Sequence, residues 1–360
     1  MNDNYFAVIM AGGGGTRLWP LSKKSRPKQL LSFNNEKSLF ALAVERLEGQ
    51  FRSENIFVVT IAEQVPALLE QAPFLSREQF IIEPQPKGTA SVIGLAAINL
   101  MKKDPDAVMA VLTADHIIEN LDLFHSLLAA ALPLAEQNHL ITLGIKPTYP
   151  ATGYGYIKAG KKFDSTESFC AEKFVEKPNE KLASQYIQDG NYFWNSGMFI
   201  WRAERILKEF GMQMPDLNEK LDQISALIEK PGFEKEFNDI WASIKPQTID
   251  YGIMENATGV LLLKAENLKW NDVGSWDSLY DFLPADTSGN VIKNSQSIII
   301  DSKDVLILNE NDKKIIAVIG LQDVVIIETE NALLICKKGE TQRVKEIVEE
   351  LKNKKFENYL

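Results

Sequence analysis

The sequence of 360 residues is poor in cysteine and histidine, and this scarcity excludes several classes of protein. Two cysteines cannot build a disulfide framework or a four-thiolate zinc site. The three histidines, His116, His125 and His139, lack the spacing of the ligands in zinc hydrolases. We therefore expect a protein of a reducing compartment that holds no zinc.

Long apolar runs and an excess of positive charge are also missing. No apolar run reaches the roughly 18 residues that a membrane helix needs, and the acidic start at residues 1–4 lacks the basic region of a signal peptide. The formal net charge of -10 disfavours non-specific binding to nucleic acid or anionic lipid. We expect a cytoplasmic protein without nucleic-acid or membrane partners, in which any bound anion meets a local basic patch.

Short apolar runs alternate with helical patterns through the first half of the chain. The runs are too short and too uniformly apolar for surface helices, so each predicts a strand buried on both faces. The alternation is typical of a three-layer α/β sandwich with a mostly parallel sheet. The predicted strands cover residues 6–11, 56–60, 80–82, 107–112 and 140–144, and the predicted helices cover residues 38–47, 63–71, 89–103 and 121–136.

The pattern changes near Pro284. Before it, strand-like pieces and helices complete the α/β domain; after it, short β-rich runs are broken by Asn, Asp and Gly. A final amphipathic helix is expected over residues 341–352. We predict a catalytic-type domain over residues 1–284 and a small β unit with a terminal helix over residues 285–360.

A glycine-rich loop follows the first predicted strand. Gly12 to Gly15 leave backbone amides uncovered by side chains, so a polyanion can approach closely. The loop fits neither the P-loop nor the dinucleotide-binding motif. Five cations follow within twelve residues: Arg17, Lys23, Lys24, Arg26 and Lys28. The glycine loop alone would indicate a flexible turn, and the basic stretch alone would indicate a solvated surface. Together at the end of a strand they favour a triphosphate site.

Two carboxylates are candidates for a magnesium site. Asp115 comes just after a predicted buried strand, where an aspartate can also serve as a turn or helix cap. Asp272 stands between Trp270 and Trp276, whose bulk is expected to fix it in place. Mg²⁺ prefers hard oxygen ligands and commonly takes one or two carboxylates plus substrate phosphates. Asp115 and Asp272 can supply that pair.

Three further segments combine small residues with polar side chains that can hold a hydroxyl or a phosphate. They are residues 153–156, 174–178 and 194–198. Within the second, Glu176 and Lys177 are adjacent. On a strand they would point to opposite faces, unless the strand ends at Pro178 and both turn inward.

In order along the chain, these segments resemble the sugar nucleotidyltransferases, and among them the mannose-1-phosphate guanylyltransferases. The glycine loop with Thr16, Arg17 and the Trp-Pro-Leu-Ser sequence, followed by Pro27-Lys28-Gln29, is similar to the signature loop of the guanylyl branch. Later segments are similar to the motifs of that family in the same order: 83–90, 114–116, 153–155, 175–178, 195–197 and 270–276.

The resemblance implies Mg²⁺-dependent transfer from GTP to mannose 1-phosphate, giving GDP-mannose and diphosphate, on a nucleotide-diphospho-sugar transferase-like fold. It implies that Arg17 and Lys28 neutralise the triphosphate and that Asp115 and Asp272 hold the metal. It further implies a sugar-phosphate site and a nucleotide site. The former comprises Tyr154, Gly155, Glu176, Lys177 and Asn195; the latter comprises Ala11, Gly12, Gly13, Gly15, Thr16, Arg17, Glu83, Gly88, Thr89 and Asp115.

The chain departs from the family pattern at the expected base pocket. Gly88 stands where Asn is frequent, and Ser91 stands where Pro is usual. A different sugar 1-phosphate or a relaxed choice of nucleotide therefore stays open.

The family also includes non-catalytic regulatory relatives that bind nucleotide sugars, but such a protein would be expected to lack Arg17, Lys28, Asp115 or Asp272, and all four are present. The residues after Pro284 are too few for the isomerase barrel of longer relatives, so we expect no isomerase activity. They resemble a short β-helix through which such enzymes often form homodimers.

Overall fold

The computed structural model describes residues 2–13, 15–33, 37–164, 166–310 and 314–360. The chain divides into two compact units, neither of which is continuous in sequence. Unit 1 comprises Met1–Gly12, Ala43–Ala114 and Ile118–Trp270. Unit 2 comprises Gly13–Leu42, Asp115–Ile117 and Asn271–Leu360.

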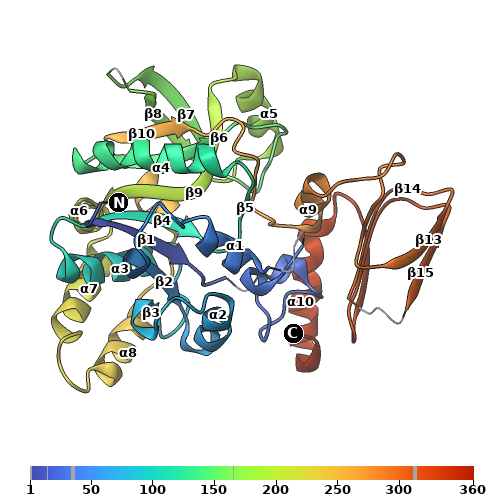
Figure 1. The fold of residues 1–360 in the computed structure, drawn as a ribbon, viewed down its shortest axis with the longest axis horizontal. Coiled ribbons are helices and arrows are strands. Elements are labelled where there is room, and N and C mark those ends of the chain that lie inside the picture. The colour runs from blue at the N-terminus through green and yellow to red at the C-terminus, as the bar shows by residue number, and fades with distance from the viewer. Residues whose placement is uncertain (1, 14, 34–36, 165, 311–313) are drawn as a thin grey trace. The chain divides into compact units, whose positions relative to one another are not determined.

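A nine-stranded sheet forms the centre of unit 1 (Figure 1). Its first four strands in spatial order run parallel, and β9 is inserted antiparallel between β4 and β6. In spatial order the strands are β3 (Phe80–Ile82), β2 (Ile56–Thr60), β1 (Tyr5–Met10), β4 (Val108–Thr113), β9 (Tyr192–Arg202), β6 (Leu140–Ile145), β10 (Val260–Lys264), β8 (Ser168–Val175) and β7 (Tyr156–Lys162).

Helices of unit 1 cover both faces of this sheet. On β1, Phe6 and Val8 point into the cluster that contains α3, whereas the hydroxyl of Tyr5 donates to the carbonyl of Leu128 in α4. Successive strand residues face opposite sides, so α3 and α4 lie on opposite faces. Unit 1 contains the end of α1 (Leu39–Glu45), because the unit resumes at Ala43. Its other helices in the described residues are α2 (Val65–Gln71), α3 (Thr89–Lys103), α4 (Leu121–Glu136), α5 (Glu180–Asp189), α6 (Ala203–Gln213), α7 (Pro215–Leu227) and α8 (Glu234–Ser243).

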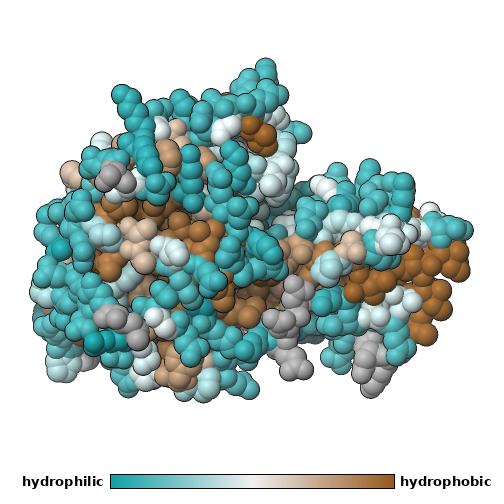
Figure 2. All heavy atoms as spheres, turned by 45° about the horizontal axis from the view of Figure 1, so that its top comes forward, coloured by the Kyte–Doolittle hydropathy of each residue, from teal (hydrophilic) through white to brown (hydrophobic). Residues whose placement is uncertain are grey.

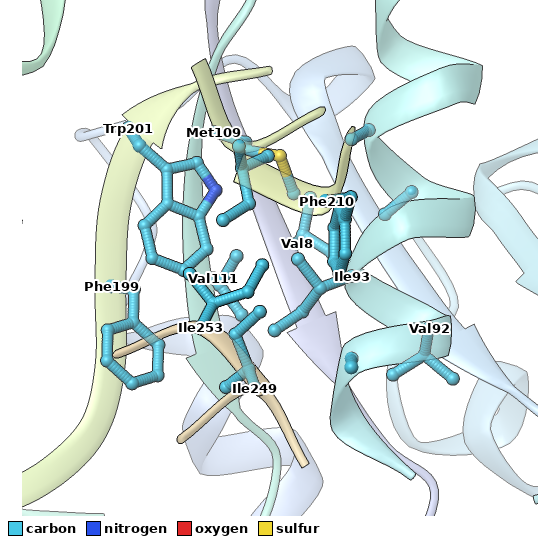
Figure 3. Close-up of a cluster of buried hydrophobic side chains, with 14 of the residues drawn as sticks. Val8, Val92, Ile93, Met109, Val111, Phe199, Trp201, Phe210, Ile249 and Ile253 are labelled. Atoms are coloured by element: carbon cyan, nitrogen blue, oxygen red, sulfur yellow. The ribbon is translucent and has the colours of Figure 1, made fainter. Parts of the chain in front are cut away.

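The main hydrophobic core of unit 1 lies between the sheet and the α3 side. Figure 3 shows Met109, Val111 and Trp201 from the sheet facing Ile93 of α3 and Phe210 of α6. Ile249 and Ile253 enter the same cluster from the segment before β10. This packing fixes the strand ends from which the candidate residues project.

Unit 2 joins a small β structure to segments from much earlier in the chain. One hydrophobic cluster contains Leu18, Trp19 and Ile117 together with Trp276 and residues of the C-terminal strands. The indole N–H of Trp276 donates to the carbonyl of Trp19 at 3.2 Å, and that of Trp19 donates to the carbonyl of Tyr359 at 2.7 Å. The segment with Leu18 and Trp19, which follows the glycine loop, therefore packs with the C-terminal segment.

The β structure of unit 2 consists of two small sheets. Strands β12 (Val291–Lys293), β14 (Lys303–Asn309), β16 (Gln322–Glu328) and β17 (Leu333–Lys337) form one sheet, and β13 (Gln296–Ile300) pairs in parallel with β15 (Ile315–Ile319) in the other. Parallel neighbours β12, β14 and β16 follow the pattern of a β-helix. Helices α9 (Trp276–Phe282) and α10 (Val344–Asn353) pack through Trp276, Leu279, Val344 and Val348.

Most of the predicted elements are confirmed. The bounds of β2, β3, α3 and α4 coincide with the predicted ranges, and the α/β fold with its C-terminal β-helix-like unit is as expected. The sequence patterns did not predict β7, α5 or α8. Cys170 and Cys336 are free thiols and only partly buried. In the described part of the chain no helix is both long and apolar enough to cross a membrane.

Candidate active site

The candidate residues of unit 2 gather around the ammonium of Lys28. Its Nζ lies 2.7 Å from Oδ2 of Asp115 and donates to the carbonyl oxygen of Asp272 at 2.5 Å. These three residues come from the three separate segments of the unit. We call them the Lys28 cluster. It brings together two carboxylate-bearing residues that are far apart in sequence, and Lys28 itself is buried.

The charge of the Asp115 carboxyl is favoured by its neighbours. Burial raises the pKa of this group, but the charges of Lys28 and His116, with the hydrogen bond from Lys28, hold the pKa below its usual value. His116 Nε2 lies 3.8 Å from Oδ1. The carboxylate is therefore ionised at neutral pH, as a metal ligand must be.

A tight turn holds Asp272. The backbone N–H of Gly274 donates to its Oδ1 at 3.0 Å, and a Cβ on Gly274 would collide with the same carboxylate. Val273 has φ of 48°, which is an outlier for a β-branched residue, and Trp276 is fully buried behind the turn. In the structure, the turn and its hydrogen bond fix this acid, and the expectation that the neighbouring tryptophans fix it stays a prediction. Strained backbone of this kind clusters at functional sites.

The glycine loop approaches Lys28 at Gly15. Gly15 has φ of 56°, and a Cβ there would lie 2.5 Å from Cβ of Lys28 and 2.8 Å from Oγ of Ser22. Thr16 and Arg17 follow on a short 3₁₀ turn and are exposed. A Cβ on Gly13 would meet no described atom within 4 Å, so the backbone there is uncovered. The remaining glycine of the loop, Gly14, lies outside the described residues.

The basic stretch is less uniform than the sequence suggested. Lys23 donates to Oδ1 of Asn331 at 2.7 Å, and Arg26 pairs with Glu310 at 2.5 Å, both within unit 2. These two cations hold the N-terminal segment to the β structure. Arg17 and Lys28 are the members of the stretch that keep a candidate role with phosphates, while Lys24 is exposed.

In unit 1, the candidate nucleotide residues Ala11 and Glu83 follow β1 and β3, and Thr60 at the end of β2 bonds to both. Thr60 donates through its hydroxyl to the carbonyl of Ala11 at 2.8 Å, and its own carbonyl accepts from the N–H of Glu83 at 2.9 Å. A Cβ on Gly12 would lie 3.0 Å from Oε1 of Glu83. The Glu83 side chain therefore points at the start of the glycine loop, where ligands of open α/β sheets bind.

Glu83 is the most unusual carboxyl of this region. The residue is 2% exposed, and Oε2 has no hydrogen-bond partner in the described part of the chain. Burial raises its pKa to about 7, against a hydrogen bond from the backbone of Lys87 that lowers it. A buried acceptor without a donor is costly, so this oxygen is suited to a donor supplied by a ligand.

Gly88 and Thr89, two candidates for the nucleotide site, also contact the segment 247–249 of the chain. Gly88 has φ of 87°, and a Cβ there would collide with the carbonyl of Gln247. Thr89 accepts the N–H of Ile249 on its hydroxyl oxygen at 2.9 Å. The departure from the family's Asn at position 88 thus has a structural reason, because only glycine fits against the 247–249 segment with this backbone conformation.

The candidate sugar-phosphate residues form a second group in unit 1. A Cβ on Gly155 would collide with Oε2 of Glu176 and would lie 3.4 Å from Cβ of Asn195. Lys177 Nζ lies 2.7 Å from Oε1 of Glu176, so the two side chains meet, with Glu176 7% and Lys177 49% exposed. The backbone at Lys177 has a positive φ, 45°.

Aromatic rings stand beside this group. Tyr154 meets Trp194 edge to face at 5.0 Å between centroids, and it meets Trp270 at 5.5 Å. The structure adds Asp250, which sequence reasoning missed: its Oδ1 accepts from Nδ2 of Asn195 at 2.8 Å. No spacing signal marks Asp250, because it is an isolated acid in a turn before β10. We call Gly155, Glu176, Lys177, Asn195 and Asp250 the Asn195 cluster.

The carboxylates of the Lys28 cluster can be compared with the ligands that Mg²⁺ prefers. No group of three or more His, Cys, Asp or Glu side chains suitable for a metal is found among the described residues. Asp115 and Asp272 each carry a carboxylate of the kind that Mg²⁺ prefers, although Lys28 contacts Asp272 through its backbone carbonyl. The remaining ligands of Mg²⁺ are commonly phosphate oxygens and water. The donor set is hard oxygen, and Asp115 is held ionised.

Comparison with known sequences identifies two matching families. Residues 6–289 match the family described as Nucleotidyl transferase. Residues 295–351 match the MannoseP isomerase/GMP-like beta-helix domain.

Individual relatives agree with these matches. The mannose-1-phosphate guanylyltransferase of Klebsiella pneumoniae is 36% identical over 98% of this chain and 75% of its own length. A protein of the same name from Escherichia coli has the same identity and coverage, 36%, 98% and 75%. A solved structure from Thermus thermophilus, described as a mannose-1-phosphate geranyltransferase, has a TM-score of 0.86 and 29% identity, covering 97% of this chain and 99% of that one.

Proposed function

The chain belongs to the nucleotidyl transferase family, and from this premise we infer that it is a mannose-1-phosphate guanylyltransferase. It converts GTP and α-D-mannose 1-phosphate to GDP-mannose and diphosphate. The observation that carries the chemistry is the Lys28 cluster, in which one buried ammonium contacts both Asp115 and Asp272. The names of the relatives support the choice of substrates.

The reaction is a displacement at phosphorus that balances without an added reagent. A phosphate oxygen of mannose 1-phosphate forms a bond to the α-phosphorus of GTP, and the bond between that phosphorus and the α,β-bridging oxygen breaks. Diphosphate leaves with the electron pair. Such transfers need charge neutralisation and in-line positioning more than covalent help.

Unit 2 supplies the charges for this step. Arg17 is exposed on the turn after the glycine loop, where its guanidinium can pair with phosphate oxygens. Lys28 neutralises charge that develops toward the leaving diphosphate. The amides of Gly13 and Gly15, with Thr16, line the approach of the triphosphate. Asp115 and Asp272 are the residues that would hold Mg²⁺, which when bound polarises phosphate oxygens as a Lewis acid.

Unit 1 supplies the groups that recognise the substrates. Ala11, Gly12, Glu83, Gly88 and Thr89 line the base and ribose. Guanine presents two adjacent N–H donors, and a single carboxylate can accept both, so the unpartnered oxygen of Glu83 favours this base. In the Asn195 cluster, Lys177 binds the phosphate of the sugar. Glu176 and Asn195 bind its hydroxyls, with Tyr154 beside them and Gly155 leaving room for the ring.

The β unit favours association with a second copy of the chain. On one face of the β13 and β15 pair, the outward residues include Ile298, Ile300, Ile315 and Ile319, and Ile319 is 67% exposed. Figure 2 shows hydrophobic surface on these C-terminal strands. An uncharged apolar face is complementary to itself, as a twofold dimer requires. We expect sedimentation equilibrium to give twice the chain mass, and Ile319→Glu to give the monomer; a wild-type monomer would contradict the dimer.

Two further parts of the proposal concern organisation and place. We propose residues 1–284 as the catalytic domain and residues 285–360 as a C-terminal region, a division of the sequence that the two family matches support. The compact units of the structure divide the chain differently, because unit 2 also contains residues 13–42, 115–117 and 271–284. We also propose that the protein works in the cytoplasm, which its unlinked thiols support.

Diphosphate release with Mg²⁺ tests the function directly. GTP, ATP, UTP and dTTP are each crossed with mannose 1-phosphate and glucose 1-phosphate. We expect release with GTP and mannose 1-phosphate. Release with other pairs would retain the chemistry and replace the substrates, whereas no release with any pair would favour a regulatory relative that only binds nucleotide sugars.

A further inference from the structure

Asp250 occupies an anchored position within the Asn195 cluster. It begins the turn Asp250–Met254. Ile249, just before the turn, and Ile253, within it, are fully buried in the main core (Figure 3). The N–H of Ile249 is held by Thr89, and the N–H of Gly252 donates to the carbonyl of Thr248 at 3.0 Å. The backbone that carries the Asp250 side chain is therefore fixed before any ligand binds.

The Asp250 carboxylate sets the orientation of the Asn195 amide. Asn195 donates through Nδ2 to Oδ1 of Asp250 at 2.8 Å, while its own Oδ1 accepts from the N–H of Gly197 at 3.1 Å and from the hydroxyl of Thr142 at 3.4 Å. Because Oδ1 faces two donors and Nδ2 faces an acceptor, a flipped amide would lose all three hydrogen bonds, so the Asn195 side chain has one satisfactory orientation. Among the described residues, Asp250 is the one acceptor for Nδ2 of Asn195, so the second N–H hydrogen can serve a ligand.

The local charge indicates that Asp250 does more than hold Asn195. An uncharged amide oxygen would accept the same hydrogen bond, yet a carboxylate stands here although burial and the charge of Glu176 raise its pKa to about 6. Lys177 is the cation of this cluster, and its ammonium contacts Glu176 rather than Asp250. A destabilised carboxylate beside an oriented amide is suited to ligand donors such as neighbouring hydroxyls.

We propose that Asp250 is a specificity-determining residue for the hexose. Its carboxylate accepts a hydrogen bond from one sugar hydroxyl, and through its bond to Asn195 it aligns the amide with an adjacent hydroxyl. The ligand class is a vicinal diol on a six-membered ring. This inference rests on the proposed function, since it concerns the sugar that the enzyme would transfer.

Binding of GDP-mannose and of GDP, each measured by titration calorimetry, isolates the contribution of the sugar. We compare the wild type with Asp250→Ala, with the isosteric Asp250→Asn, and with Asp222→Asn as a matched control on the exposed face of α7. Loss of a charge-assisted hydrogen bond predicts that Asp250→Ala binds GDP-mannose about tenfold to a hundredfold more weakly. GDP affinity should change less than about twofold, and the control should match the wild type.

A second arm separates direct binding from support of the fold. Asn195→Ala combined with Asp250→Ala should weaken GDP-mannose binding by less than the product of the two single effects, because the residues act as a unit. Asp250→Asn retains the acceptor for Asn195 and should fold as the wild type while losing sugar affinity. Equal weakening of GDP and GDP-mannose, or unchanged binding in both variants, would overturn the proposal. A wild type that binds GDP-mannose no better than GDP would instead overturn the proposed function.

Discussion

The two units organise their candidate residues by different means. In unit 1, the candidates Ala11 and Glu83 follow β1 and β3, and both are held by Thr60 at the end of β2, which lies between those strands. In unit 2, Lys28, Asp115 and Asp272 come from three separate segments that one hydrophobic cluster holds in place. A strand end can be located from sequence periodicity, whereas a cluster of distant segments depends on packing. The nucleotide residues Ala11 and Glu83 belong to the first kind, and the Lys28 cluster belongs to the second.

Asp272→Asn gives the largest expected effect and tests the charged group of unit 2. The change removes one charge and retains Oδ1 as the acceptor for the N–H of Gly274. We expect kcat to fall by about a thousandfold or more, because a pre-placed charge at the reacting phosphates is lost. Steady-state kinetics measure it, with Asp281→Asn on the exposed side of α9 as the control. Normal turnover would remove Asp272 from the charged group.

Glu83→Gln tests whether the buried carboxyl that we assign to base recognition lowers the free energy of unfolding. The pKa of this acid is raised on folding to about 7 from 4.5, so the folded state binds more protons between those values, and its stability falls as pH rises through that window. Relative to the wild type, the free energy of unfolding of the variant should rise by about 3 kcal/mol from pH 4 to pH 8. Denaturant titration at both pH values measures this difference.

The outcome for Glu83 sharpens the comparison between the units. If the difference in free energy of unfolding between wild type and variant did not change with pH, burial would not raise the pKa of the Glu83 carboxyl. The same variant should also lose its preference for GTP over ATP, because the amide has one acceptor oxygen in place of two. An unchanged preference would place guanine recognition elsewhere.

Gly15→Ala tests the packing of unit 2 without removing a charge. The added methyl group meets Cβ of Lys28 and Oγ of Ser22, so it displaces the backbone that carries the ammonium. We expect kcat to fall by roughly thirtyfold, since small misplacements of catalytic groups are costly. Gly49→Ala is the control, because Gly49 also has a positive φ, 75°, but nothing lies within 4 Å of the added carbon. Equal behaviour of the two variants would attribute the effect to backbone conformation alone.

Lys177→Met gives the smallest expected effect and returns to unit 1. Lys177 is exposed and contributes one ammonium, so its loss should raise the KM for mannose 1-phosphate about tenfold and leave the KM for GTP unchanged. The matched control is Lys173→Met, an exposed lysine on β8. A change confined to the KM for GTP would contradict the assignment of Lys177 to the sugar phosphate.

Much of the fold follows from the sequence because its signals are local. Uniformly apolar runs gave β2 and β3 at their observed bounds, and helical spacing gave α3 and α4. Strand β7, which pairs with both β8 and β9, was missed because Tyr156–Lys162 contains three lysines and alternates less clearly. Likewise, α5 and α8 are polar helices whose pattern is weak without knowledge of the surface that they cover.

The candidate residues divide in the same way. The glycine loop and the adjacent Glu176 and Lys177 could be selected from their motifs, although the contact between the two side chains could not. The structural work of Lys23 and Arg26 could not be predicted, because their partners Asn331 and Glu310 lie in the C-terminal strands. Asp250 carries no local signal, and only its contact with Asn195 reveals it.

By itself, the sequence determined the α/β class, the order of the motifs and the chemical kinds of residue that the reaction needs. These are properties of periodicity and residue type, which are written locally along the chain. Tertiary structure alone decided that Lys28 contacts both Asp115 and Asp272, and that Gly88 must be glycine against Gln247. It also decided that Glu83 and Asp250 are carboxyls with raised pKa values. Contacts, burial and electrostatic fields depend on which distant segments pack together, and no single segment encodes that choice.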